Sequence, residues 1–199
     1  MMNNVSLSSF NLWAFISFSV LAFPCFSADI LDSPNTLRIL NNIDERRGKM
    51  TAEGISAAKS LNKEGDKAYL QQDYRKAYRA YYNSYPNYPN AYAYIMAGDT
   101  SWRMLISYNK AMTSEQHCQL NNKYFPHDLD QDISQTYEVG LALAVKDKEI
   151  KLMESSIYKR AIESHRCLRK LYYFYKSQPS DVCIDVNNIQ TCLGKPLIE

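Results

Sequence analysis

The sequence predicts an all-α protein of antiparallel helical pairs that ends in an irregular, disulfide-closed tail. Two observations favour helices. The chain has only 6 glycines in 199 residues, and its apolar residues recur at steps of three and four, which is the period of a helix with one buried face. A strand pattern competes only briefly, over 181–186. We therefore expect helices throughout the folded part of the chain.

Five ranges have helical periodicity: 34–44, 52–72, 74–85, 90–112 and 133–176. Thr51 and Asp73 are the expected N-caps of the second and third helices, because their short side-chain oxygens can accept from the first free backbone N–H groups. The last range is expected to break near Asp147, giving two antiparallel helices. Residues 113–130 are expected to form a long connection.

The first 27 residues have the features of a secretory signal peptide. They contain no Asp, Glu, Lys or Arg, and their apolar run, residues 12–23, is too short to span a membrane. Small residues precede Ala28, where cleavage is expected. The sequence thus predicts a signal peptide (1–27), a helical domain (28–178) and a tail (179–199). The mature chain would be periplasmic or secreted, without a stable membrane anchor.

Four cysteines follow the signal peptide: Cys118, Cys167, Cys183 and Cys192. An even number in an exported chain indicates disulfides, and four cysteines allow three pairings. We favour Cys183–Cys192, which would close a short loop in the tail, together with Cys118–Cys167. A zinc site that uses His117 and His165 beside Cys118 and Cys167 is the alternative, but its spacing matches no common zinc pattern. No metal site and no cofactor are expected.

The third helix carries a stripe of aromatic residues: Tyr74, Tyr78, Tyr81 and Tyr85. Their spacing places the rings on one side of the helix, a pattern typical of a face that packs against another helix. Gly65 in the second helix and Ala77 in the third are small enough to let the two helices approach closely. The tyrosines are therefore expected to be packing residues.

Residues 58–90 resemble the tetratricopeptide repeat, a pair of helices closed by a proline. The matching residues are Leu61, Gly65, Tyr74, Ala77, Tyr81 and Pro89. Tyr108 and Ala111 follow the Tyr-Ala pair of this unit after 34 residues, which is the period of the repeat. A plain helical bundle, in which these residues only pack, is the alternative.

The resemblance implies a scaffold that binds a protein or peptide in a groove, mainly through the first helix of each pair. Carried onto this chain, the residues expected to face the partner are Lys59, Asn62, Asp66 and Tyr69, with Arg103 as the counterpart of Tyr69 in the next unit. Asp66 would repel a carboxylate, so a terminal carboxylate is not the expected ligand. The partner's identity and the oligomeric state do not follow from the sequence.

Two other functions remain open. An inhibitor or immunity-type protein that blocks a toxin or a cell-wall hydrolase would use a protruding loop, either 113–130 or the loop between Cys183 and Cys192. An enzyme acting on the cell envelope would need convergent polar residues, but no phosphate-binding loop, metalloprotease or nucleophile-elbow motif is present, and no catalytic residue is assigned.

The charge of the chain gives no reason to expect a nucleic-acid partner. The net charge is +2, and the basic segment 159–170 contains Glu163 and follows Glu154, so it has the composition of a solvated helix face.

Overall fold

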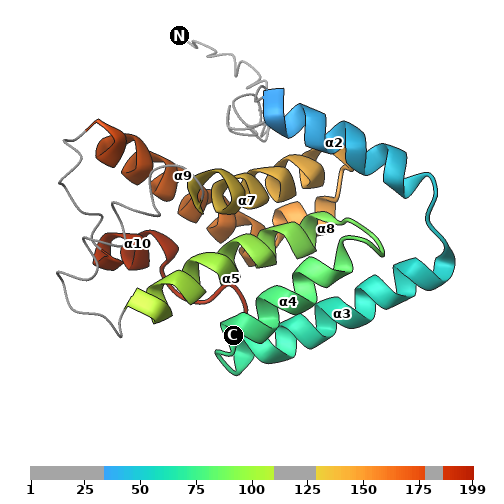
Figure 1. Cartoon of the computed structure of the whole chain (residues 1–199), viewed down its shortest axis with the longest axis horizontal. Helices are drawn as coiled ribbons and strands as arrows, with labels where there is room; N and C mark the ends of the chain where they lie inside the picture. Colours follow the sequence, from blue (N-terminus) through green and yellow to red (C-terminus); the bar gives the residue numbers. More distant parts are fainter. Residues whose placement is uncertain (1–33, 110–128, 178–185) are drawn as a thin grey trace, which may run out of the picture.

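The computed structural model describes residues 34–109, 129–177 and 186–199, all of them in helices or short connections (Figure 1). Within these ranges the regular structure is entirely α-helical, so the predicted fold class is confirmed. The signal peptide, residues 110–128, Cys118 and Cys183 lie outside the described residues. The helices begin with α2 (Pro34–Arg47), which buries Leu40 and Ile43 and packs on α7 (Leu129–Lys146).

The helical pair α3 (Ala52–Leu70) and α4 (Tyr74–Ser84) has the two predicted N-caps. The Thr51 hydroxyl accepts from the Gly54 N–H at 3.2 Å, and the Asp73 carboxylate accepts from the Lys76 N–H at 3.1 Å. Between the helices Gln72 has φ 59° and reverses the chain. Both helices therefore begin where short polar side chains satisfy their first backbone donors.

Gly65 of α3 allows the pair to pack closely, as its position in the sequence predicted. A Cβ atom at this position would lie 2.6 Å from the ring of Tyr81 in α4. Tyr81 and Ala77 are both fully buried. Tyr85 continues the aromatic stripe and stacks on Tyr94 with ring centroids 4.0 Å apart. The predicted packing role of these residues is confirmed.

The centre of the molecule is the antiparallel pair α5 (Ala91–Asn109) and α7. A Cβ on Gly140 of α7 would lie 2.7 Å from the backbone nitrogen of Ile95, so the two helices approach here at backbone distance. Tyr108 is the penultimate residue of α5, whereas Tyr74 is the first residue of α4. The two tyrosines that are 34 residues apart therefore occupy different places in their helices, and Ala111 lies outside the described residues.

The predicted break near Asp147 is confirmed. α7 ends at Lys146, and Lys148 has φ 53°. A short helix, α8 (Ile150–Glu154), leads into the long α9 (Ser156–Lys176). The Arg47 guanidinium lies 2.6 Å from the Asp147 carboxylate and also donates to the Pro89 carbonyl at 2.8 Å. This arginine thus ties the end of α2 to the break and to the α4–α5 turn.

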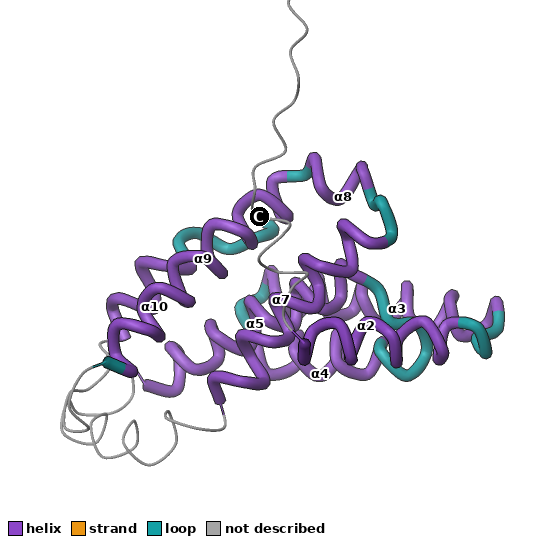
Figure 2. Tube along the Cα trace, turned by 90° about the horizontal axis from the view of Figure 1, so that it is seen from above, coloured by secondary structure: helices purple, strands orange, loops and turns teal. Residues whose placement is uncertain are grey.

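The tail differs from the prediction in two ways. Residues 186–193 form a helix, α10 (Val186–Leu193), which lies beside α9 (Figures 1 and 2). Cys192 of this helix is bonded to Cys167 of α9, so the favoured pairs Cys183–Cys192 and Cys118–Cys167 are wrong. The apolar residues Val186, Ile189 and Leu193 recur at helical spacing and are buried, which explains why this part of the tail is helical rather than irregular.

Candidate functional site

Four of the five predicted partner-binding residues lie along α3, and the fifth, Arg103, comes from α5. The structure brings Tyr69 and Arg103 together: the Arg103 Nε–H donates to the Tyr69 hydroxyl at 2.9 Å. The structure also divides the predicted binding face into two parts. We call Tyr69, Arg103 and their neighbours Asp99 and Arg160 the covered end, and Lys59, Asn62, Asp66 and Tyr92 the open end.

Asp99 is the centre of the covered end and is fully buried. Its carboxylate accepts from the Tyr69 hydroxyl, from the Tyr137 hydroxyl at 2.9 Å and from the Arg103 Nε–H at 2.6 Å. These donors come from three helices, α3, α7 and α5. A buried carboxylate needs such compensation, because removal from water disfavours its charge. Asp99 therefore fixes the side chains that carry the covered end.

The covered end holds the protein's own C-terminal residues, which we call the tail segment (194–199). Arg103 Nη2 donates to the Lys195 carbonyl at 2.7 Å. Arg160 of α9 donates to the Pro196 carbonyl at 2.7 Å and also to the Leu197 carbonyl. In return the Leu197 N–H donates to the Tyr69 hydroxyl at 2.9 Å. This last contact places the tail segment against Tyr69, near the C-terminal end of α3.

The hydroxyl of Tyr69 has no remaining hydrogen-bonding capacity. It donates to Asp99 and accepts from Arg103 and from the Leu197 backbone, which uses its one proton and both lone pairs. Burial, and after it the charge of Asp99, raises the pKa of Tyr69 well above its usual value. For Arg103 burial alone would lower the pKa, but Asp99 outweighs it and raises the pKa. The phenol stays neutral and the guanidinium charged.

At the open end the side chains are accessible. Lys59 is exposed, and Asn62 and Asp66 are half-buried. One oxygen of Asp66 accepts from the Tyr81 hydroxyl at 2.8 Å and from the Tyr92 hydroxyl at 2.6 Å. Asn62 donates to the Asn90 side chain at 3.4 Å, while its own Oδ1 is buried and has no hydrogen-bond partner among the described residues. This oxygen is therefore an unsatisfied buried acceptor, and the accessible charges of the open end are those of Lys59 and Asp66.

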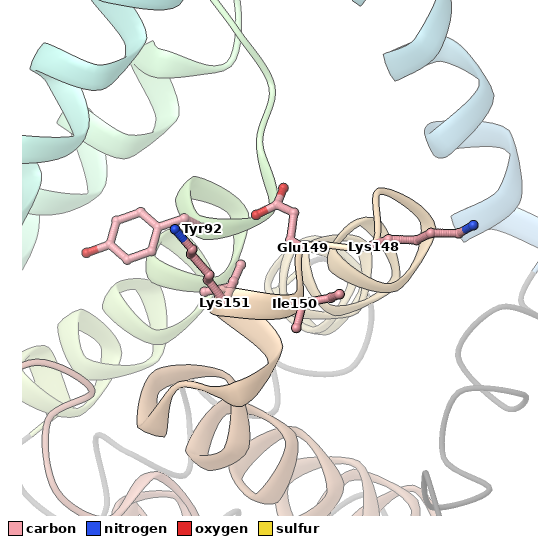
Figure 3. A pocket seen from close by; sticks show the side chains of 6 residues that line it. Tyr92, Lys148, Glu149, Ile150 and Lys151 are labelled. Carbon is pink, nitrogen blue, oxygen red and sulfur yellow. The ribbon is translucent and has the colours of Figure 1, made fainter. Parts of the chain in front are cut away.

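A pocket of about 550 Å³ lies beside the open end, between Tyr92 of α5 and residues 148–152 of the α7–α8 region (Figure 3). In Figure 3 Lys148 extends away from Tyr92, toward α2. Burial, followed by repulsion from Asp147, raises the pKa of Glu149 above its usual value. The lining of the pocket combines charged side chains of both signs, Lys148, Glu149 and Lys151, with the apolar side chains of Ile150 and Leu152.

The described residues give no support to a metal centre. None of their His, Cys, Asp and Glu side chains form a group of three or more that could hold an ion. Cys167 is bonded to Cys192, so it cannot serve in the alternative zinc site, and His117 and Cys118 lie outside the described residues. Residues 113–128 of the loop considered for an inhibitor also lie outside them.

Sequence reasoning missed two residues of the covered end, Asp99 and Arg160, and also Tyr137, which donates to Asp99. Asp99 carried a signal that could have found it, because it is a lone acid in an apolar helix with Arg103 one turn later. Arg160 was included in a basic segment interpreted as a solvated face, but it binds tail carbonyls. Tyr137 had no local signal, since its role depends on α7 lying against α5.

Comparisons with known proteins add no assignment. No family model, no curated protein and no solved structure matches the chain. Within the described residues no helix is both long and apolar enough to cross a membrane.

Proposed function

We propose that this chain is an exported protein-binding module that holds a segment of a protein partner against α3 and its neighbouring helices. The observation that carries the proposal is the way the covered end holds the tail segment. Tyr69, Arg103 and Arg160 bind four successive residues, 194–197, through backbone atoms. Side chains that bind backbone groups can hold a peptide with little regard to its sequence.

The resemblance of residues 58–90 to the tetratricopeptide repeat supports the same function. Repeats of that family bind partners through the first helix of each pair, which here is α3. The close contact of Gly65 with Tyr81 is the packing that the resemblance implies. At the open end Lys59, Asn62 and Asp66 would contact the partner. Export is supported by the expected signal peptide and is compatible with the Cys167–Cys192 disulfide.

The test is a lysine-directed crosslinking pull-down from an envelope extract, with the chain from Ala28 as bait and mass spectrometry as readout. The proposal predicts a partner crosslinked to Lys59, Lys63 or Lys151, near the open end. Lys59→Glu should reduce its capture several-fold, because it reverses a charge on the binding face. Lys76→Glu, which also reverses the charge of an exposed lysine but lies on α4, is the matched control. Equal capture by both variants, or no enriched partner, would contradict the proposal.

A further inference from the structure

The contacts of the tail segment separate into two kinds, and the backbone contacts are the larger set. The carbonyls of Gly194, Lys195, Pro196 and Leu197 all accept from Arg103 or Arg160, and the Leu197 N–H donates to Tyr69. Gly194 has φ 57° and the backbone bends at residues 195 and 197, so a peptide that follows the same bent path presents the same groups. The arginines and the tyrosine therefore provide a preformed site for peptide backbone.

The side-chain contacts are concentrated on one residue. Leu197 is 1% exposed, whereas Lys195 and Glu199 are exposed and Pro196 and Ile198 are half-buried. A peptide that replaced the tail segment would need a leucine-sized side chain at the position of Leu197 and could vary at Lys195. Near the end of the segment Arg160 lies 3.5 Å from the Glu199 carboxylate, which favours an acidic residue there.

The tail segment is tethered close to this site. Cys192, two residues before Gly194, is bonded to Cys167 of α9. A tether of this kind raises the effective concentration of the segment at the site, typically by orders of magnitude. Cys167 and Cys192 are only half-buried, so a small dithiol can reach the bond between them.

We propose that the tail segment is an intramolecular competitor in a peptide-binding site, and that the partner is a protein segment of the same chemistry. That chemistry is a leucine preceded by proline and followed within two residues by an acid, as in Pro196-Leu197-Ile198-Glu199. The inference rests on the proposed function and names the partner class for the same surface. The partner enters the covered end when the tail segment leaves it.

The disulfide controls how readily this exchange occurs. A dithiol reduces the bond with two electrons and two protons, which yields the thiols of Cys167 and Cys192 and the cyclic disulfide of the reductant. Without the bond the tail segment is held only by α10 and its own contacts. Its effective concentration falls, and a competing peptide binds more tightly.

The experiment is a fluorescence anisotropy titration with a labelled synthetic peptide of residues 193–199, LGKPLIE. Three forms of the protein are compared: the oxidised chain, the chain reduced with dithiothreitol, and a chain ending at Gly194. We expect the shortened chain to bind the peptide at least tenfold more tightly than the oxidised chain, with the reduced chain between them. A matched peptide with aspartate in place of Leu197 should bind at least tenfold more weakly to the shortened chain.

Circular dichroism decides whether the shortened chain is folded. If it is not, the full-length Leu197→Ala variant replaces it, because its weakened tail segment should also increase binding of the peptide. The inference is overturned if the peptide binds no form, or if the aspartate peptide binds equally well. When the peptide fails but the pull-down captures a partner through Lys59, this inference is wrong and the proposed function stands. When both fail, both are wrong.

Discussion

The two ends of the α3 face differ in whether their polar side chains have hydrogen-bond partners within the chain. At the covered end Tyr69, Asp99 and Arg103 are buried, and their hydrogen bonds go to one another and to the tail segment. At the open end Lys59 is exposed and Asn62 keeps a buried oxygen without a described partner. One face of the same helix therefore contains polar groups that are fully satisfied within the chain and polar groups that are not.

The covered end is expected to matter more for stability than the open end. A buried ion pair is costly to form, but removing one partner leaves the other charge buried and unpaired. Asp99 and Arg103 are such a pair, with the tyrosine hydroxyls satisfying the remaining acceptor sites of the carboxylate. The accessible Asp66 can exchange a lost partner for water.

The largest effect is therefore expected for Asp99→Asn. The variant keeps the shape but leaves the Arg103 guanidinium without its counter-charge, so the free energy of unfolding should fall by about 3–4 kcal/mol. Urea denaturation followed by circular dichroism measures it. A loss below about 1 kcal/mol would mean that the pair is not buried as described.

Leu197→Ala should have the next largest effect. It empties the buried position that anchors the tail segment, and the expected loss of stability is about 2–3 kcal/mol. Ile150→Ala beside the open end is the matched control, because Ile150 is 64% exposed and its removal should cost less than about 0.5 kcal/mol. Similar losses in the two variants would remove the distinction between the ends.

A pH dependence should come from His165, which lies on α9 next to Ser164, a residue that contacts the Leu193 carbonyl. Burial, and after it the charge of Arg169, lowers the pKa of His165 to about 4 from its usual 6.5. As pH falls the unfolded chain therefore takes up the proton first. The free energy of unfolding has its full value above pH 6.5 and falls between pH 6.5 and 4, by about 3 kcal/mol in all, because each pKa unit corresponds to about 1.4 kcal/mol.

Comparison with His165→Gln isolates this contribution. Thermal unfolding of both proteins between pH 7 and pH 4 should show the wild-type chain losing more stability than the variant. Glu149 has the opposite effect: because its pKa is raised in the folded chain, its protonation stabilises the fold as pH falls. This effect is the same in both proteins and therefore cancels in the comparison. Parallel pH profiles would show that His165 is not buried in its neutral form.

The smallest effect is expected for Asp66→Asn at the open end. The amide oxygen can still accept from Tyr81 and Tyr92, so stability should change by less than about 1 kcal/mol. Partner capture in the crosslinking pull-down should nevertheless fall, since the charge faces the proposed partner. A large loss of stability with unchanged capture would place Asp66 in the core instead of the binding face.

Local signals in the sequence predicted the helices but not the covered end. The caps Thr51 and Asp73, the break near Asp147 and the small residue at Gly65 act over one or two turns, so periodicity and side-chain size reveal them. The Cys167–Cys192 bond depends on α10 lying beside α9, which no short stretch of sequence encodes. The same holds for Arg160, whose partners are more than 35 residues away.

The most direct test of the account is native-state amide hydrogen exchange, measured residue by residue by NMR on the oxidised chain. If the tail segment is a separable occupant, the Leu197 amide should exchange through a partial opening that requires less free energy than global unfolding. The amides of Ile95 and Met96 in the centre of α5 should exchange only on global unfolding. Equal protection of Leu197 and the α5 amides would contradict the account, because the tail segment would then be an inseparable part of the core.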